Sequence, residues 1–406
     1  MEFISKRSRY VVNPLEEEDA IAEKLRKKGK EVIELNRGDP SVYFKTPEYI
    51  IEAYIGALKE SKTHYVASAG VYELRNAVAE RYKRMYNIEV DEDSIIVTQG
   101  VSEAIQFINA AMINPGEKAI LFKPYYPIYI PYLLNYGGIP LFEKYSERLK
   151  WNIDTDSLEK TIKKEASKRP KYMLITNPNN PTGTVLDRKV LKEIVELANE
   201  YDIFLISDEI YDEIVFNGAK FTSIGELAKG MPHMILNGAS KDFDATGFRI
   251  GFAIIPENDK KSRQIKHAIL QYAQARLSAN APAQYAVAEA MNNVKEHNAS
   301  IRAMVKEIES RVNFATKLVN ESSYLTAIEP NSAFYLFPRI NKNILKIKDD
   351  REFVKRLLIE QQVQLARGSG FGEEGYVRIV ALAEKEILSL AINKINEFCK
   401  QHSVKR

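Results

Sequence analysis

Short apolar runs alternate with amphipathic stretches through the middle of the chain. The helical spacing is clearest at Leu191, Ile194, Val195 and Ala198, which recur three or four residues apart and form one apolar face. Strands that alternate with helices in this way are typical of a largely parallel sheet. The apolar runs predict strands over residues 95–98, 119–122, 172–176, 203–206, 234–236 and 250–255.

The pattern changes near residue 285, where long helical patterns begin and the strands become sparse. An arm, a polar helix and a short strand precede residue 45. We therefore expect an α/β fold with two domains. Residues 45–285 would form a large domain, in which a mostly parallel, seven-stranded-type sheet lies between helices. Residues 1–44 and 286–406 would form a smaller α+β domain.

The composition excludes several classes of protein. The 406 residues are 45% apolar and 28% charged, and 58 basic against 55 acidic residues leave a net charge of only +3. Such a balance predicts no nucleic-acid or membrane partner, and no apolar run is long enough to span a bilayer. The N-terminus lacks the apolar segment of a signal peptide. One cysteine, Cys399, and five scattered histidines predict no disulfide and no metal site, and a reduced cytoplasmic location.

Polar residues gather where the predicted strands end. In an open α/β sheet, ligands bind outside the carboxyl ends of the strands. Taken singly, each residue has an ordinary interpretation: Asp208 as a strand-end cap, Asn180 as a turn former, Tyr126 as a packed loop aromatic. Together they predict a binding site, and its residues are Val101, Ser102, Tyr126, Asn180, Asp208, Tyr211, Ser240 and Lys241.

Lys241 lies in the most informative stretch, residues 236–252. It follows a turn between two apolar runs, and Arg249 comes eight residues later, at the start of the second run. One interpretation is a loop lysine whose stem covers apolar surface while its amine reaches water. The other is an amine held in a pocket for Schiff-base chemistry, with an arginine nearby to hold an anion.

An anion seat is predicted next to this lysine. The N–H groups of Val101 and Ser102 start a helix, for which Ser102 is the expected N-cap, and the hydroxyls of Ser102 and Ser240 with the Arg249 guanidinium suit a phosphate. Neither a G-x-G-x-x-G nor a G-x-x-x-x-G-K-[ST] motif is present. A carboxylate, a lysine and a phosphate seat therefore indicate pyridoxal 5′-phosphate as cofactor.

Four motifs carry a family resemblance, which covers nearly the whole chain. They are Asn177–Gly183, Ser207–Tyr211, Ser240-Lys241 with Gly247–Gly251, and Val377–Ile379. In order and spacing they resemble the class I aminotransferases, which are fold-type I pyridoxal phosphate enzymes. Residues 35–40, Tyr211-Asp212 and residues 368–373 are most similar to the alanine aminotransferase branch.

The resemblance implies roles for the cofactor-binding residues. Lys241 would form a Schiff base with the cofactor aldehyde and carry the Cα proton, and Asp208 would pair with the pyridine nitrogen. Asn180 and Tyr211 would donate hydrogen bonds to the phenolate oxygen, while Tyr126 would stack on the ring. Residues 45–285 would thus bind the cofactor, and the smaller domain would close over the substrate.

The resemblance also implies how substrate and partner subunit are bound. Arg378 would clamp the substrate carboxylate, and the backbone at Gly38 would cover the substrate. Tyr65, in a loop closed by Gly70, would reach the phosphate in the partner subunit, so that a homodimer shares its active sites. Alternatively, Tyr65 packs locally and Arg378 is structural.

The expected reaction is transfer of an amino group from an alanine-like L-amino acid to 2-oxoglutarate. Aspartate or aromatic donors, or a pyridoxal phosphate lyase on the same scaffold, are alternatives. A regulator with an appended DNA-binding domain is not expected, because few residues precede the first strand. A second arginine for a side-chain carboxylate is not evident; Arg37 and Arg276 are the candidates.

Overall fold

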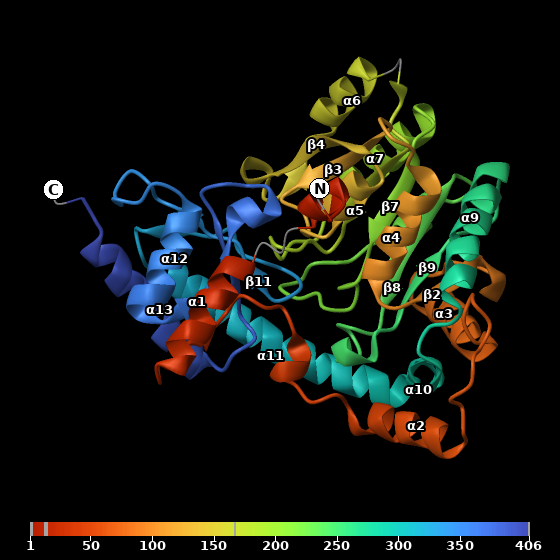
Figure 1. The fold of residues 1–406 in the computed structure, drawn as a ribbon, viewed down its shortest axis with the longest axis horizontal. Coiled ribbons are helices and arrows are strands. Elements are labelled where there is room, and N and C mark those ends of the chain that lie inside the picture. Colours follow the sequence, from red (N-terminus) through yellow and green to blue (C-terminus); the bar gives the residue numbers. More distant parts are fainter. Residues whose placement is uncertain (1–2, 12–14, 166–167, 405–406) are drawn as a thin grey trace.

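A computed structural model describes residues 3–11, 15–165 and 168–404, so five residues of the predicted N-terminal arm (1–2 and 12–14) lie outside it. Its main feature is an eight-stranded sheet with helices on both faces (Figure 1). In spatial order the strands are β2 (Ile95–Thr98), β9 (Gly251–Ile254), β8 (His233–Gly238), β7 (Phe204–Asp208), β6 (Tyr172–Thr176), β3 (Lys118–Lys123), β4 (Ile139–Ser146) and β5 (Asn152–Ile153).

The sheet is mostly parallel. Strands β8, β7, β6, β3 and β4 pair in parallel, whereas β9 is antiparallel to both neighbours and β5 is antiparallel to β4. Strands β2, β6, β7, β8 and β9 are buried along their whole length. Burial on both faces explains why their sequences read as continuous apolar runs rather than alternating ones. The predicted α/β fold is confirmed.

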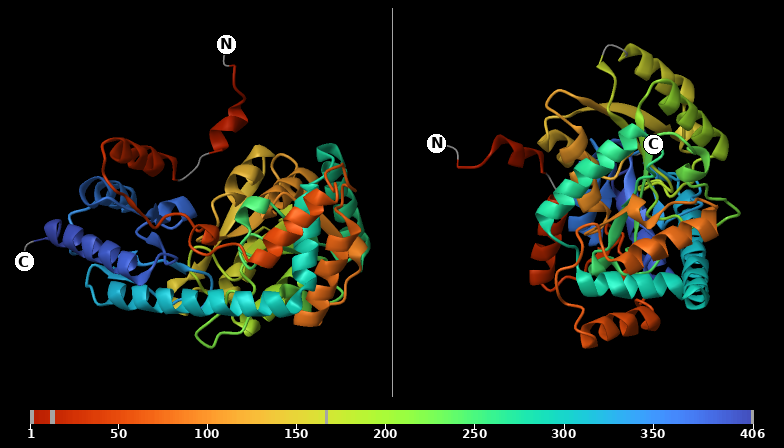
Figure 2. Two further views of the ribbon diagram at one scale, coloured as in Figure 1. Left: turned by 90° about the horizontal axis from the view of Figure 1, so that it is seen from below. Right: turned by 90° about the vertical axis from the view of Figure 1, so that its right-hand side faces the viewer.

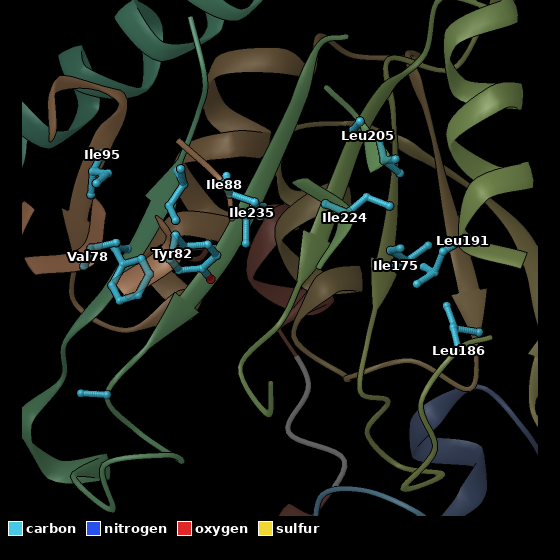
Figure 3. Close-up of a cluster of buried hydrophobic side chains, with 14 of the residues drawn as sticks. Val78, Tyr82, Ile88, Ile95, Ile175, Leu186, Leu191, Leu205, Ile224 and Ile235 are labelled. Carbon is cyan, nitrogen blue, oxygen red and sulfur yellow. The ribbon is translucent and has the colours of Figure 1, made fainter. Parts of the chain in front are cut away.

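Helices form a separate core on each face of the sheet. On one face lie α3 (Tyr72–Tyr86), α7 (Arg188–Glu200) and α10 (Ala281–Asn292), with α2 (Glu48–Lys59) packed outside α10. Figure 3 shows part of this core, including Tyr82, Leu191 and Ile235. The other face is covered by α4 (Val101–Met112), α5 (Tyr129–Asn135) and α9 (Lys260–Arg276).

A further core belongs to the N- and C-terminal parts of the chain. Three small sheets contribute to it: β11 (Tyr335–Leu336) with β15 (Val377–Val380) and β14 (Ala366–Arg367); β1 (Ile33–Glu34) with β13 (Val363–Gln364); and β10 (Leu325–Thr326) with β12 (Arg339–Ile340). Helices α1 (Glu16–Lys27), α12 (Asp350–Gln361) and α13 (Lys385–Gln401) pack around them. The parallel pairing of β1 with β13 joins the N-terminal segment to this C-terminal part.

One long helix connects the two regions. α11 (Val294–Asn320) starts beside α10 and runs along the molecule to the C-terminal core, as Figures 1 and 2 show. Its first turns carry His297, whose ring stacks on Phe243 near the large sheet. Its later turns bury Ile308 and Val312 in the C-terminal core. A single rigid element therefore takes part in both regions.

Most predicted elements agree with the structure, and the differences have physical causes. Strand β4 and helix α6 (Thr155–Lys164) were not predicted. Only Glu143 and Tyr145 of β4 are buried, so its apolar residues do not mark a buried strand. The prediction of Ser102 as N-cap was wrong. Gly100 occupies that position with φ 75°, a left-handed conformation that glycine adopts without strain.

The described ranges contain neither a membrane-spanning helix nor a metal-binding group of side chains. No helix there is both long and apolar enough to cross a bilayer. No group of three or more His, Cys, Asp or Glu side chains in the same ranges is arranged to hold a metal ion.

Candidate active site

The carboxyl ends of β6, β7 and β8 open into one cavity of about 300 Å³. All the predicted site residues line it except Tyr65. They are Gly38, Val101, Ser102, Tyr126, Asn180, Asp208, Tyr211, Ser240, Lys241, Arg249 and Arg378. Residues that are far apart in sequence therefore meet at one place, at the edge of the sheet where ligands of such folds bind.

Lys241 enters the cavity from the loop after β8. Its Nζ donates a hydrogen bond to the carbonyl oxygen of Gly38 at 2.6 Å. Burial lowers the pKa of the Lys241 amine to about 8, although the Asp39 carboxylate acts in the opposite direction. An amine with such a pKa is partly neutral near neutral pH, as a nucleophile or a general base requires.

Asp208 ends β7 and is 3% exposed. Its carboxylate accepts hydrogen bonds from the Tyr129 hydroxyl at 2.7 Å and from the backbone N–H of Ile210 at 3.3 Å. Burial raises the pKa of Asp208 to about 6, and the Tyr129 hydrogen bond opposes part of that rise. The side chain is thus a buried acid that gains from a cationic or N–H partner in the cavity.

Arg378 comes from β15 in the C-terminal part and is 5% exposed. Nη1 donates to Asn180 Oδ1 at 2.9 Å, and Nη2 donates to the Asn36 carbonyl. The guanidinium lies between two aromatic rings, 4.7 Å from the Tyr335 centroid and 4.6 Å from that of Phe371. Burial lowers the pKa of Arg378. No carboxylate of the described residues forms an ion pair with it.

The predicted anion seat is formed by the start of α4 and the Arg249 side chain. Gly100 precedes the free N–H groups of Val101 and Ser102. A Cβ added at Gly100 would lie 2.4 Å from Arg249 Nη2, so only glycine lets the guanidinium approach this helix end. Arg249 Nη1 donates to the Thr246 carbonyl at 2.8 Å and remains largely exposed. Helix N–H groups and a guanidinium together suit a phosphate.

Tyrosines line the rest of the cavity. The hydroxyls of Tyr211 and Tyr335 lie 2.7 Å apart, and Tyr126 packs edge-on against Tyr129 with centroids 5.7 Å apart. Tyr335 also packs against residues 36–39, which we call the covering segment. A Cβ at Gly38 would lie only 2.1 Å from the Tyr335 hydroxyl oxygen. The backbone at Gly38 can therefore close on this wall only without a side chain.

Tyr65 lies outside the cavity of its own chain and is 80% exposed. It borders a different hollow, together with His64, Gln99 and Asn280. Gly70, at the end of the same loop, has φ 108°, and a Cβ there would lie 2.3 Å from Val97 Cγ2. The loop is thus held against β2, while its tyrosine is presented outward.

The family whose description is "Aminotransferase class I and II" matches residues 30–394. The chain belongs to this aminotransferase family.

This aminotransferase is similar to proteins with different named substrates. It is 32% identical to the aspartate aminotransferase of Bacillus subtilis, with 95% of each chain covered. It is 30% identical to the glutamate-pyruvate aminotransferase AlaA of Escherichia coli, over 93% of this chain and 92% of that one. Among solved structures, the alanine aminotransferase of Pyrococcus furiosus superposes with a TM-score of 0.93 at 36% identity, covering 98% of this chain and all of the other.

Of the two candidate arginines for a side-chain carboxylate, only Arg37 borders the cavity of the aminotransferase. Arg276 lies elsewhere: its guanidinium is paired with Glu103 at 3.1 Å and donates to the Ser68 carbonyl at 3.0 Å. These contacts hold Arg276 in the wall between α9 and α4. It is not a cavity residue in this chain.

Several cavity residues were missed at the level of sequence. Tyr129 and Tyr335 were not singled out, because a tyrosine in a helix or a short strand has no distinguishing pattern. Asp39 and Thr246 belong to motifs that had been noticed, the Gly38-Asp39-Pro40 turn and the loop that ends at Arg249. Their contact could not be read from spacing: the Thr246 hydroxyl donates to Asp39 Oδ1 at 2.9 Å across 207 positions.

Proposed function

We propose that this aminotransferase uses pyridoxal 5′-phosphate to move an amino group from an alanine-like L-amino acid to 2-oxoglutarate. The observation that carries the proposal is the convergence, in one cavity, of a low-pKa lysine, a buried acid, an anion seat and a buried arginine without an acidic partner. Each of these groups matches one functional group of the cofactor or of an amino acid.

The residues present fit the cofactor. Asp208 would pair with the pyridine N–H, Asn180 and Tyr211 would donate to the phenolate oxygen, and Tyr126 would cover the ring. The phosphate would bind to Val101, Ser102, Ser240 and Arg249, which all line the cavity. When bound, pyridoxal phosphate supplies an electron sink for the Cα of the amino acid.

Lys241 would carry the covalent attachment and move the proton. Its amine is directed into the cavity and is held by the Gly38 carbonyl at 2.6 Å. In the neutral form the nitrogen can bond to an aldehyde carbon. Once released by the substrate, it could take a proton from Cα and deliver it to the cofactor carbon that had carried the aldehyde.

Arg378 would bind the α-carboxylate of the substrate. A guanidinium offers two parallel N–H donors, so it fixes the orientation of a carboxylate as well as its position. The Asn180 side chain and the Asn36 carbonyl accept hydrogen bonds from the Arg378 guanidinium and fix its position. This orientation decides which Cα bond is perpendicular to the cofactor ring, and we propose that it is the C–H bond.

The choice of substrates rests on the resemblance and on relatives with printed names that include glutamate-pyruvate and alanine aminotransferases. Aspartate or an aromatic amino acid is an alternative donor, since aspartate and aromatic aminotransferases are also similar at 32% and 34% identity. A lyase on the same scaffold is a second alternative. It would release ammonia or carbon dioxide instead of forming glutamate.

We further propose a homodimer in which Tyr65 reaches the phosphate of the partner subunit. Its 80% exposure and its place outside the cavity of its own chain support this role. The proposed domains, residues 45–285 and residues 1–44 with 286–406, would close over the substrate. The buried Cys399 suits the reduced cytoplasm that the composition predicts.

The test compares purified wild-type enzyme with two lysine variants, using alanine and 2-oxoglutarate. Wild type should form pyruvate and glutamate in equal amounts. Lys241→Ala should lower turnover by at least about ten-thousandfold, since it removes both attachment and proton transfer, while the cofactor still binds noncovalently.

Lys266→Ala serves as the control, because Lys266 is a half-buried lysine of α9, paired with Glu257 outside the cavity. It should keep wild-type turnover. Near-normal transfer by Lys241→Ala, or release of ammonia without glutamate by wild type, would contradict the proposed function.

A further inference from the structure

Asp242 is a buried acid that the proposed reaction does not use. It directly follows Lys241 in the chain, but it does not line the cavity. Its Oδ2 lies 3.5 Å from Arg81 Nη2. The same nitrogen lies 3.0 Å from Asp212 and 2.6 Å from Glu213. Three carboxyl groups therefore surround one guanidinium, and we call these four residues the Arg81 cluster. The loop that carries Lys241 reaches this cluster with its very next residue.

Two of the three carboxyl groups have the donors that an ionised group needs. The Asn237 amide donates to Asp212 Oδ1 at 2.9 Å, and the Tyr86 hydroxyl donates to Oδ2 of the same side chain. Glu213 accepts a hydrogen bond from the guanidinium, and its Oε1 lies 2.8 Å from His297 Nε2. Both side chains are therefore stabilised as carboxylates.

Asp242 has no such donor. Its side chain is completely buried, and among the described residues no N–H or O–H group donates a hydrogen bond to either of its oxygens. The guanidinium nitrogen at 3.5 Å is farther away than a normal hydrogen-bond donor. An ionised carboxyl group would be costly in such a place, whereas a protonated one can donate its O–H to the adjacent Asp212 carboxylate. Burial and the two neighbouring carboxylates accordingly raise the pKa of Asp242 well above its usual range, although the guanidinium opposes them.

The other titratable groups around the two acids are compatible with a neutral Asp242. On α3, burial raises the pKa of the Tyr82 and Tyr86 hydroxyls well above its usual value, so both phenols stay neutral. On α11, His297 is directed at Glu213. The same imidazole stacks on Phe243, which follows in the loop, with ring centroids 4.3 Å apart. Two successive residues of the loop are therefore held on the side away from the cavity.

We infer that Asp242 is a positioning residue for Lys241: as a neutral acid it donates a hydrogen bond to Asp212, and this bond anchors the Lys241 loop to the Arg81 cluster. On the cavity side, the Gly38 carbonyl holds the Lys241 amine at 2.6 Å. The backbone and the amine are thus fixed from opposite sides. The inference rests on the proposed function, because it concerns the position of that amine, and it deepens the function by naming a residue that orients the amine from outside the cavity.

The kinetic test compares two variants of the cofactor-loaded enzyme. Asp242→Ala should lower kcat by about tenfold or more at an unchanged KM for the amino acid, because a small displacement of the Lys241 amine slows proton transfer while the substrate is bound by other residues. Asp242→Asn should keep kcat within about twofold of wild type, because its amide N–H can replace the carboxyl O–H as the donor to Asp212. A tenfold lower kcat in Asp242→Asn as well would overturn the inference.

Infrared spectroscopy tests the protonation of Asp242 independently of activity. At neutral pH, the difference spectrum of wild type minus Asp242→Asn should contain the carbonyl band of a protonated carboxylic acid. A carboxylate band in its place would overturn the inference. If Lys241→Ala transferred amino groups at the normal rate, the proposed function would fail, while the infrared result would still decide the state of Asp242.

Tyr86→Phe is a matched control for stability. It removes another hydrogen bond to Asp212, but from α3 and not from the Lys241 loop. Its urea midpoint should fall about as much as that of Asp242→Ala, while its kcat stays at the wild-type value. Equal losses of kcat in Tyr86→Phe and Asp242→Ala would mean that Asp242 acts only through the stability of the cluster, which would also overturn the inference.

Discussion

Two buried arginines in this enzyme have opposite electrostatic surroundings. Arg81 of α3 is 2% exposed, and its Nη2 lies 3.0 Å from Asp212, 2.6 Å from Glu213 and 3.5 Å from Asp242. Arg378 is 5% exposed, and its contacts are an amide oxygen, a carbonyl oxygen and two aromatic rings. Both are taken out of water, but carboxylates compensate the charge only at Arg81.

The difference also appears in the proton equilibria. Burial opposes the charged form of Arg81, yet the Asp212 and Glu213 carboxylates outweigh it and raise the pKa of Arg81 well above its usual value. Burial lowers the pKa of Arg378, since no such carboxylates oppose it. A buried cation with its counter-ions belongs to the framework of the protein, whereas one without them is prepared to receive an anion.

The largest expected effect concerns the compensated arginine. Arg81→Leu should lower the free energy of unfolding by about 3–5 kcal/mol, because it leaves buried carboxylates without their cation. Urea unfolding followed by circular dichroism measures the change. Adding Asp212→Asn and Glu213→Gln to this variant should restore much of the loss. If Arg81→Leu were as stable as wild type, the charge compensation at this cluster would have no structural importance.

Arg378→Leu should show the reverse pattern. We expect kcat/KM for the amino acid to fall by a factor equivalent to about 2–5 kcal/mol, with KM raised at least about tenfold, because the α-carboxylate loses its partner. The free energy of unfolding should change by less than about 1 kcal/mol, since an uncompensated buried charge is also removed. Steady-state kinetics and urea unfolding on one preparation test both parts. A destabilisation as large as that of Arg81→Leu would make Arg378 a structural arginine.

The pH dependence of cofactor attachment sharpens the comparison at Lys241, the other cavity cation with a lowered pKa. Only the neutral amine can bond to an aldehyde, so the attachment rate should rise about tenfold per pH unit below pH 8 and level off above it. Asp39 opposes the lowering of this pKa, so Asp39→Asn should move the midpoint to lower pH. Stopped-flow absorbance with cofactor-free enzyme measures the profile. A midpoint near 10.5, the ordinary lysine value, would show that burial does not act on this amine.

The smallest expected effect concerns Asp208, the acid that we propose to pair with the cofactor nitrogen. Tyr129→Phe removes the hydrogen bond to Asp208 and should weaken cofactor binding by an amount equivalent to about 0.5–1.5 kcal/mol. Fluorescence titration of the cofactor-free enzyme measures the dissociation constant. Tyr172→Phe is the control, since its buried hydroxyl donates to Asn109 at 2.8 Å away from the cavity. Equal losses of affinity in both variants would mean that Tyr129 acts only through stability.

The sequence predicted the cavity better than it predicted the surroundings of the cavity. Asp208, Asn180 and Lys241 could be assigned because strand ends meet at one edge of a parallel sheet, so order along the chain becomes proximity in space. The pairing of Arg81 with Asp212 could not be assigned in this way. Arg81 lies on an amphipathic helix, where an arginine normally indicates an exposed face, and only the packing of α3 on the sheet shows that it is buried.

The contacts made by the covering segment could not be predicted from the sequence either. The hydrogen bond from Lys241 to the Gly38 carbonyl joins residues 203 positions apart and involves a backbone atom, which no side-chain pattern can indicate. The same applies to Arg378 and the Asn36 carbonyl. The incorrect prediction of Ser102 as the N-cap has a related cause. A glycine is needed at position 100 because the Arg249 side chain, which is distant in sequence, packs against it.

The long helix α11 gives the compensated cluster a mechanical meaning. His297, in its first turns, lies 2.8 Å from Glu213 and is stacked on Phe243, so this end of the helix is fixed to the Arg81 cluster. The 27 residues that follow from Val294 span roughly 40 Å. The buried ion cluster thus fixes one end of a single rigid helix, whose other end lies in the core that carries Arg378.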